Sequence, residues 1–412
     1  MLLTIILSTT DIIRLPIASI SLFRVSFILT FLLSIGYIII KGSIRKNNTT
    51  LFVVLILVSS PLAFIISTNK EWATSFLLND IMGALLIFLV VEFFTLNDLN
   101  RLQKAFIQSQ YITIFLSVYS YYYHYFLNGL PRSFSFFSFF TIDISEEFIR
   151  RASIFGQLRL ALPYATPPHL SIIMVIALAI LVINKDLFSR TFRYFLLASF
   201  GLILISTYSR TGIVAGIIVF LVDLMSKRKI NIKKVVIGLL VLLSLVVIFM
   251  NVNSTNLDKF ANRFVINDLL EDRHLLVPVE GILIWLSSVK NFFFGIGYGS
   301  SINIQGRFTF LPPHFLNSYV TLIAEKGLLG FTMVSVLLIR SFRLNILKKK
   351  MYFNKNVLSL YYSYGIILAS FLFYEAKQNI SVWIIVSIVF LVTSYQDSNS
   401  LRKRGKISEI QE

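Results

Sequence analysis

Six side chains in this sequence have the types needed to transfer a group away from a diphosphate. Guanidinium groups stabilise the negative charge that develops on a departing diphosphate through bidentate hydrogen bonds. The candidates for this role are Arg159, Arg210 and Arg273. An attacking hydroxyl group must also lose its proton to a nearby general base. The candidates for that base are His314, Glu280 and Glu325.

The apolar composition of the chain determines which elements must position these residues. Of the 412 residues, 56% are hydrophobic and 14% are charged, a composition that a soluble domain of this size does not tolerate. We therefore predict an all-α polytopic membrane protein, in which each span needs about 20 apolar residues. Eleven candidate spans lie near 19–40, 51–67, 75–95, 106–126, 168–183, 195–208, 211–225, 235–251, 322–340, 357–375 and 380–396. Residues 1–18 form a doubtful twelfth, which Asp11 and Arg14 interrupt.

The net charge of +18 follows the same pattern. Basic residues gather after alternate spans and in the C-terminal tail, so one orientation places every set on the cytoplasmic side, as the positive-inside rule predicts. The charge therefore indicates topology, and we expect no nucleic-acid partner. The sets are Lys41, Arg45 and Lys46; Arg101 and Lys104; Lys185, Arg190 and Arg193; Lys227, Arg228, Lys229, Lys233 and Lys234; Arg343, Lys348, Lys349, Lys350 and Lys355; and Arg402, Lys403, Arg404 and Lys406.

The same orientation leaves two large loops on the outer side of a single integral membrane domain, 1–412. They are residues 127–167 and 252–321, and loops of this length are usually functional. No dense set of Asp, Glu and His occurs in them, and the chain has no cysteine. We therefore expect a reaction that needs neither a metal nor another cofactor.

Three aromatic or apolar segments lie beside or within these loops. The tyrosine-rich run 119–125 is typical of an aromatic belt at the membrane surface, with a sugar-stacking surface as the alternative. The phenylalanines of 134–140 indicate an amphipathic segment in the interface. Residues 274–294 predict a buried or interfacial helix that the glycine cluster 295–299 ends.

Several short motifs follow one another along the second half of the chain and the segment just before it. They are Arg151-Ala152-Ser153-Ile154-Phe155-Gly156; Ser209-Arg210-Thr211-Gly212; Trp285 followed by Phe294-Gly295-Ile296-Gly297-Tyr298-Gly299; and Pro313-His314 through Asn317-Ser318-Tyr319 to Glu325-Lys326-Gly327-Leu328-Leu329-Gly330. Together, over roughly 150–340, they resemble the O-antigen polymerase and O-antigen ligase family of bacterial envelope glycosyltransferases.

This resemblance implies a GT-C-like membrane enzyme at the outer face of the bacterial cytoplasmic membrane, acting on glycans carried by polyprenyl pyrophosphate. It implies that the diphosphate and glycan are bound by Arg210, Arg159, Arg273, Asn317 and Tyr319. It also implies membrane lipid, a chain-length regulator and a flippase of the same pathway as partners. Arg273 stands farther from Trp285 than the corresponding arginine of the family does.

The ligase branch of the family carries a histidine directly before the motif asparagine. Here Leu316 precedes Asn317, and the nearest histidine is His314. This departure favours a polymerase, which would extend O-antigen, capsule or another exopolysaccharide, with a ligase as the first alternative. A lipid-linked oligosaccharide flippase is the second alternative, but a flippase more naturally shows internal repeats and short outer loops.

Structural readings compete with the functional ones. Arg210 could extend to the lipid headgroups, the pair Pro312-Pro313 could simply fix the loop beside His314, and Glu325 could bond to a helix N-terminus. Asp80 and Arg24 could pair with each other or line a lipid path.

Overall fold

The computed structural model describes residues 1–14, 21–44, 48–127, 133–136, 140–142, 160–164, 166–226, 273–303, 315, 317–346, 355–372 and 379–408. Two predicted site residues, Arg159 and His314, lie outside the described residues, as does the candidate span 235–251.

The described residues are mainly helical, as the sequence predicts. The helices are α1 (Leu2–Ile6), α2 (Leu22–Lys41), α3 (Asn48–Ile66), α4 (Lys70–Phe93), α5 (Leu99–Ser109), α6 (Tyr111–Phe126), α8 (Pro167–Ile183), α9 (Arg190–Ser206), α10 (Arg210–Ser226), α13 (Arg273–Leu286), α14 (Val289–Phe294), α15 (Ser318–Ile346), α16 (Lys355–Ser370) and α17 (Ile380–Ser408). Short 3₁₀ helices are η1 (Leu7–Ile12), η2 (Leu96–Asp98) and η4 (Ser300–Asn303).

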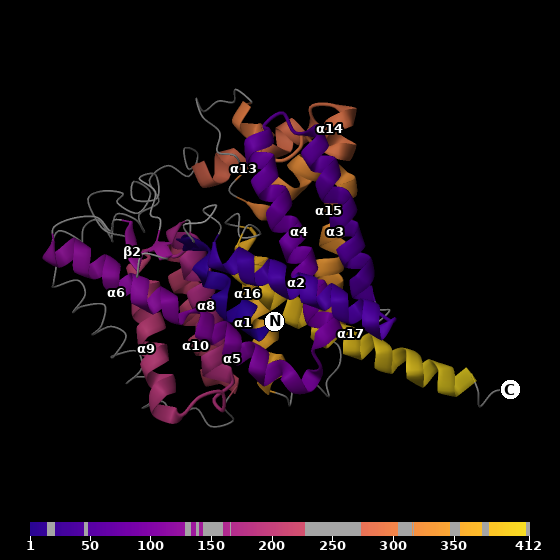
Figure 1. Ribbon diagram of the computed structural model, residues 1–412. Coiled ribbons are helices and arrows are strands. Elements are labelled where there is room, and N and C mark those ends of the chain that lie inside the picture. Colours follow the sequence, from indigo (N-terminus) through magenta and orange to yellow (C-terminus); the bar gives the residue numbers. More distant parts are fainter. Residues whose placement is uncertain are drawn as a thin grey trace.

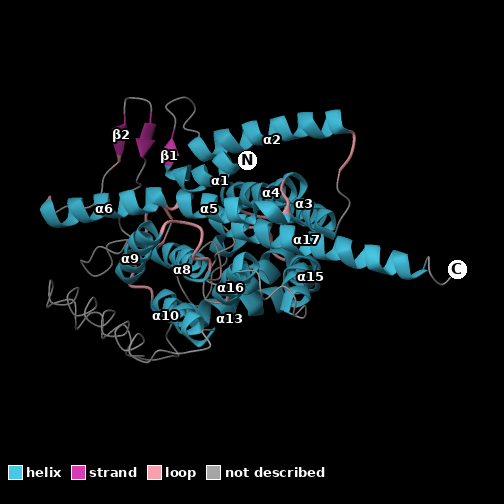
Figure 2. Ribbon diagram, turned by 90° about the horizontal axis from the view of Figure 1, so that it is seen from below, coloured by secondary structure: helices cyan, strands magenta, loops and turns pink. Residues whose placement is uncertain are grey.

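Two of the described helices, α2 and α4, are long and apolar enough to cross a membrane by length and composition. Shorter apolar helices occur at Val53–Ile66, Pro167–Ile183, Leu276–Leu286 and Ile380–Tyr395. The helices do not share one direction. Seen from below, α3, α4, α8 and α15 appear nearly end-on, whereas α2 and α6 run across the view (Figure 2).

The described part of the N-terminal segment, residues 1–14, does not form the single long helix that a twelfth span would need. It forms α1, η1 and a strand, β1 (Ile13–Arg14). This strand pairs antiparallel with β3 (Phe140–Ile142), which also pairs antiparallel with β2 (Phe134–Phe136). Residues 134–136 and 140 of the phenylalanine segment therefore belong to a small antiparallel sheet. Its run of phenylalanines has the aromatic composition that strands favour.

The candidate span 106–126 is interrupted at Gln110, where α5 ends and α6 begins. The Gln110 side chain is buried and holds the break, since its Nε2 donates to Ser109 Oγ over 2.8 Å and its Oε1 accepts from Tyr164 Oη over 2.8 Å. A buried amide needs such partners, and it finds them where α5 ends and α6 begins.

The core lies where α8 and the first half of α17 are buried along most of their length. Helix α8 packs against α9, α10 and α16, and α17 packs against α4 (Figure 1). Both segments are apolar on all sides, which is typical of helices that neighbours surround.

Several loops that carry predicted cytoplasmic basic residues meet at one end of this core. Asn184 Nδ2 donates to Asn100 Oδ1 over 3.2 Å, and Lys355 Nζ lies 3.3 Å from Asp186 Oδ2. At the ends of α2 and α4, Lys41 Nζ lies 3.2 Å from Glu92 Oε1. The end of α2 thus lies beside the end of α4, and the end of α8 lies beside the start of α16.

Candidate functional site

Helix α15, which carries the last of the sequence motifs, is broken at Gly327. This glycine has φ 65° and ψ −175°, so the helical conformation stops there and resumes afterwards. The carbonyl groups one turn earlier therefore need donors from elsewhere. Ile296 N–H donates to Ala324 O over 2.9 Å, and Gly297 N–H donates to Glu325 O over 3.0 Å. The motif 295–299 thus fills the break in α15 with main-chain hydrogen bonds.

This glycine loop fits only because positions 295, 297 and 299 carry no side chain. Gly297 has φ 84°, and a Cβ atom there would lie 2.3 Å from the backbone nitrogen of Ser67. The next residue, Tyr298, donates its N–H to Ala63 O over 3.2 Å, and its carbonyl accepts from Ser67 Oγ over 2.6 Å. The glycines therefore let the loop lie directly against the end of α3, and no dinucleotide-binding fold surrounds them.

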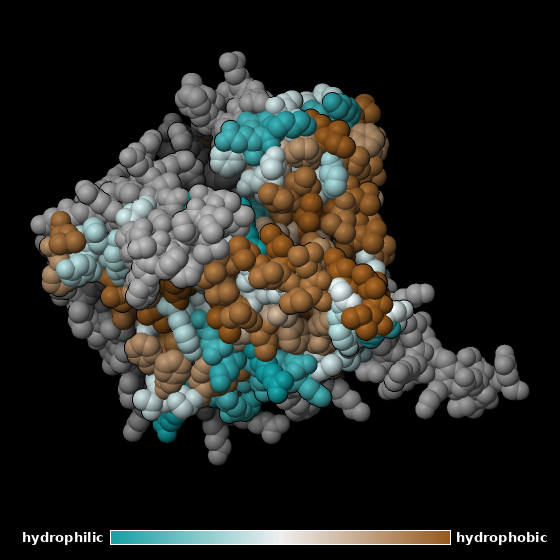
Figure 3. Space-filling model, viewed as in Figure 1, coloured by the Kyte–Doolittle hydropathy of each residue, from teal (hydrophilic) through white to brown (hydrophobic). Residues whose placement is uncertain are grey.

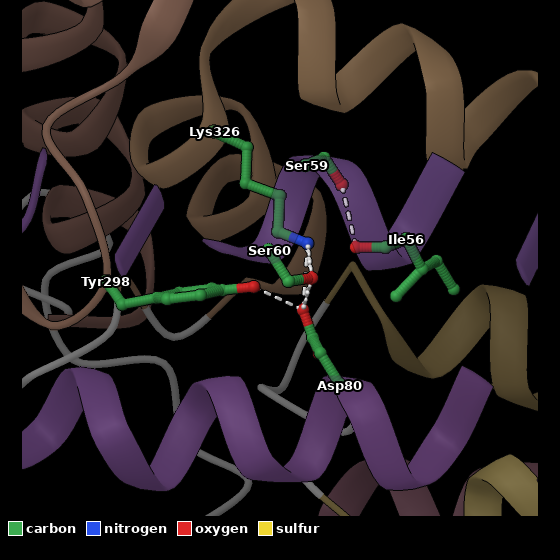
Figure 4. Close-up of polar contacts among 6 residues, drawn as sticks. All are labelled: Ile56, Ser59, Ser60, Asp80, Tyr298 and Lys326. Carbon is green, nitrogen blue, oxygen red and sulfur yellow. Dashed lines mark hydrogen bonds and ion pairs between the residues drawn. The ribbon is translucent and has the colours of Figure 1, made fainter. Parts of the chain in front are cut away.

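A buried ion pair lies beside the break. Lys326 Nζ is 2.8 Å from Asp80 Oδ2, and the two side chains are only 2% and 9% exposed. Ser60 Oγ donates to the same carboxylate oxygen over 3.1 Å, and Tyr298 Oη donates to it over 2.5 Å. Figure 4 shows these four side chains converging from α3, α4, α15 and the glycine loop. We call Ser60, Asp80, Tyr298 and Lys326 the buried charge cluster.

The charges of the buried charge cluster are compensated by other members of the cluster. Lys326 Nζ also donates to Ser60 Oγ over 3.0 Å and lies 5.3 Å from the centroid of the Tyr298 ring. Burial, followed by the charge of Asp80, raises the pKa of the loop residue Tyr298 well above its usual value. The phenol therefore stays protonated and acts as a donor. Each charge is compensated inside an apolar surrounding, which is the condition for burying it.

The pairing of Asp80 answers a question that the sequence left open, because this carboxylate forms its ion pair with Lys326. The alternatives from the sequence were that Asp80 pairs with Arg24 or lines a lipid path. The signal was present, since Asp80 and Lys326 are opposite charges within or beside apolar runs. The two residues are 246 positions apart in the chain, so no local sequence pattern predicts that they pair.

Glu325 has a defined structural contact. Its side chain is buried, and Oε1 accepts from Gly299 N–H over 3.0 Å, directly before η4. This geometry corresponds to the structural alternative considered for Glu325, a bond to a helix N-terminus. Glu280 lies on α13 and is half-buried.

Asn317 and Tyr319 tie the start of α15 to the end of α16. Asn317 Oδ1 accepts from the N–H groups of Tyr319 and Val320 over 3.0 Å, so it caps α15. Its Nδ2 donates to Leu372 O over 2.7 Å, and Tyr319 Oη donates to Leu368 O over 3.0 Å.

Ser318, Tyr319, Asp80 and Lys326 also line a small cavity whose remaining wall is apolar and includes Trp383. The cavity has a volume of about 30 Å³, which is enough to hold a water molecule.

Arg210 is the first residue of α10, and a tightly bonded turn precedes it. Ser209 Oγ accepts from Gly212 N–H over 3.3 Å and from Ser171 Oγ over 3.0 Å. Tyr208, directly before Ser209, has φ 50°, a conformation that residues other than glycine rarely adopt. The start of α10 is thus fixed against α8, with the positive end of the helix dipole beside Arg210.

Two other predicted elements meet this turn. Leu160, the residue after Arg159, donates its N–H to Ser206 O over 3.1 Å. Tyr121, from the tyrosine-rich run, donates a hydrogen bond to Ser206 Oγ. Another member of the run, Tyr122, is exposed and stacks on Phe126. The run therefore contributes both a structural contact and an exposed aromatic surface.

The described motifs form two groups at the ends of the helices opposite the basic loops. One contains the turn before Arg210 and the segment after Arg159; the other contains α13, the glycine loop and the start of α15. Tyr164 links the first group to the start of α17 through a 3.3 Å contact with Ser381 Oγ. Among the described residues, no cluster of three or more His, Asp or Glu side chains could hold a metal ion.

No family model matches the chain, and no curated protein matches it either.

Proposed function

We propose that this chain is a polysaccharide polymerase, which transfers a growing glycan from polyprenyl pyrophosphate to a lipid-linked repeat unit. The reaction takes place at the outer face of the bacterial cytoplasmic membrane. The observation that carries the proposal is the fixed turn before Arg210, because Ser209 and Ser171 hold the start of α10 in place and the positive dipole end of a helix favours an anion. The motif resemblance gives that anion its identity as a diphosphate.

In the proposed multi-pass arrangement, with about eleven spans and a GT-C-like fold, α3 faces lipid. Its exposed residues form one stripe at helical spacing, Leu51, Val54, Val58, Leu62 and Ile65. Figure 3 supports this, since hydrophobic side chains occupy the middle of the visible face and hydrophilic ones gather at its upper and lower ends. The basic loops at one end then face the cytoplasm.

The reaction that we propose has one bond-forming and one bond-breaking event. A sugar hydroxyl of the lipid-linked repeat unit attacks the anomeric carbon of the growing chain, and the bond from that carbon to the diphosphate oxygen breaks. Arg210, Arg159 and Arg273 stabilise the charge on the departing diphosphate. The hydroxyl proton passes to a general base, and no metal takes part.

The general base in this proposal is His314 or Glu280. Glu325 is disfavoured, because its carboxylate already accepts a hydrogen bond from Gly299 in a buried position. Asn317 and Tyr319 position the start of α15 through their contacts with α16, and any glycan contact that they make adds to that role.

A ligase that moves a finished glycan to another acceptor is the second candidate, and a flippase is the third. Reconstitution of the purified protein with a lipid-linked repeat unit separates them. A polymerase gives a ladder of chains that remain on polyprenyl pyrophosphate, whereas a ligase needs a different acceptor. A flippase moves the substrate across the bilayer without lengthening it. A chain-length regulator and a flippase of the same pathway are the expected partners.

A further inference from the structure

Helices α13 and α14 carry an apolar surface that the described parts of the protein leave uncovered. Large apolar side chains are exposed along both helices: Val279, Ile282, Leu283, Leu286, Val289, Phe293 and Phe294. Exposed fractions range from 39% at Ile282 to 77% at Val289. A continuous patch of this kind on a protein marks an interaction surface.

The opposite side of α13 already has a partner. Val277 is buried with Phe315 and Ala324, and Ile284 and Trp285 pack against them. Gly281 brings α13 so close to α15 that a Cβ atom there would lie 2.6 Å from a methyl group of Val320. The helix thus has two apolar sides, of which α15 covers one.

The pair of helices is held as a rigid hairpin. Trp285 stacks on Phe292 with 4.9 Å between the ring centroids, and its indole N–H donates to Phe292 O over 2.9 Å. The connecting turn is polar, and Ser288 caps α14 by accepting from Asn291 N–H over 3.1 Å. The exposed apolar surface is therefore a fixed part of the fold.

We infer that the exposed surface of α13 and α14 is embedded in the outer leaflet of the membrane, where it contacts lipid acyl chains. Helix α13 has 14 residues and is shorter than every described helix that corresponds to a candidate span, so an interfacial position suits its length. The inference rests on the membrane location given in the proposed function.

Lipid is the occupant that the neighbouring surface favours. Helices α13 and α14 pack on α15, which packs on α3. In Figure 3 the brown side chains continue from the region of α14 down over α3, where the lipid-facing stripe lies. The exposed Lys290 lies on α14, and a cation at the edge of an interfacial helix suits phosphate headgroups.

Site-specific fluorescence tests the inference, because a chain without cysteine gives no background labelling. Single substitutions Leu283→Cys and Phe293→Cys probe the surface. Val58→Cys on the α3 stripe is the control for lipid, and Lys185→Cys on the exposed opposite end is the control for water. Each variant is labelled with a small fluorophore and reconstituted in vesicles that contain brominated lipid.

The expected result is a loss of fluorescence at 283 and 293 to brominated lipid equal to that at 58, with little loss to aqueous iodide. Quenching of 283 and 293 by iodide alone, while 58 responds to lipid, overturns the inference. Protection of 283 and 293 from both quenchers also overturns it, because protein then covers this surface. If 58 also responds only to iodide, the membrane location itself is wrong.

Discussion

Lys326 and Asp80 form an ion pair of 2.8 Å across 246 positions of the chain, and they do so next to the break in α15. Buried ion pairs often add little net stability, because desolvation offsets the attraction between the charges. This pair instead joins α4 to α15 at the point where α15 loses its regular hydrogen bonds. Its position indicates a role in fixing the glycine loop.

Replacing Lys326 by Met should destabilise the protein by about 3–5 kcal/mol, because the Asp80 carboxylate then stays buried without its cation. The double variant Asp80→Asn/Lys326→Met should recover most of this loss, since no charge remains to be desolvated. Thermal unfolding in detergent micelles measures both variants. A single variant as stable as the wild type would contradict the assignment of the pair.

Replacing Tyr298 by Phe should cost about 1.5–3 kcal/mol, the usual value for a hydrogen bond to a charged group. Since the pKa of Tyr298 is raised, its contribution is complete below the ordinary tyrosine pKa of 10.0 and is lost as pH rises through the elevated value. Unfolding of the wild type and the variant at neutral and alkaline pH measures the difference.

Tyr122→Phe provides the control for this comparison, because Tyr122 is 52% exposed on α6. It should unfold like the wild type at every pH. An equal effect of the two substitutions would show that the Tyr298 phenol has no special contact with Asp80.

Gly327→Ala should prevent the glycine loop from docking, because the new methyl carbon would lie 2.3 Å from the carbonyl oxygen of Phe293. The positive φ of Gly327 adds strain. We expect a loss of folded protein in size-exclusion profiles after mild heating. Gly36→Ala in α2 is the matched control, since no atom lies within 4 Å of its Cβ position and alanine favours helices. A Gly327→Ala variant that behaves like Gly36→Ala would contradict the tight approach.

Substitutions of Asn317 distinguish a structural role of this side chain from a role in substrate binding. Asn317→Asp keeps the oxygen that caps α15 but loses the Nδ2 donor to Leu372, whereas Asn317→Ala loses both contacts. If the contacts are mainly structural, the cap alone contributes about 1 kcal/mol, and the Ala variant should unfold at a lower temperature than the Asp variant. If both variants fold like the wild type and both fail to bind glycan, the structural account of Asn317 is wrong.

The sequence predicts the helices around the core well, because long apolar runs such as 168–183 and 75–95 leave few alternatives. It does not predict the break at Gln110, which depends on the Tyr164 hydroxyl group from a distant segment. Nor does it predict that residues 140–142 pair with Ile13 and Arg14 on one side and with residues 134–136 on the other, since strand partners are not encoded locally.

For the candidate site, too, the sequence predicts some features and not others. The glycines of 295–299 are visible in the sequence, but their partner, the broken α15, is not, because Gly327 looks like one more glycine in an apolar run. The charges of Asp80 and Lys326 are also visible, yet only the packing of α4 on α3 and α15 determines that they meet. Local patterns thus indicate which residues are unusual, and tertiary packing decides how they pair.

The most direct test of the central claim is elongation of a lipid-linked repeat unit by reconstituted wild-type, Arg210→Ala and Arg210→Lys proteins. Arg193→Ala is the control, since Arg193 lies near the opposite end of α9. We predict a ladder of chains on polyprenyl pyrophosphate with the wild type and the control, and a loss of about 100-fold or more with Arg210→Ala. Arg210→Lys should recover only part of the activity, because a lysine keeps the charge without the bidentate geometry. No ladder from folded wild-type protein with its native substrate, or equal ladders from the wild type and Arg210→Ala, would contradict the account.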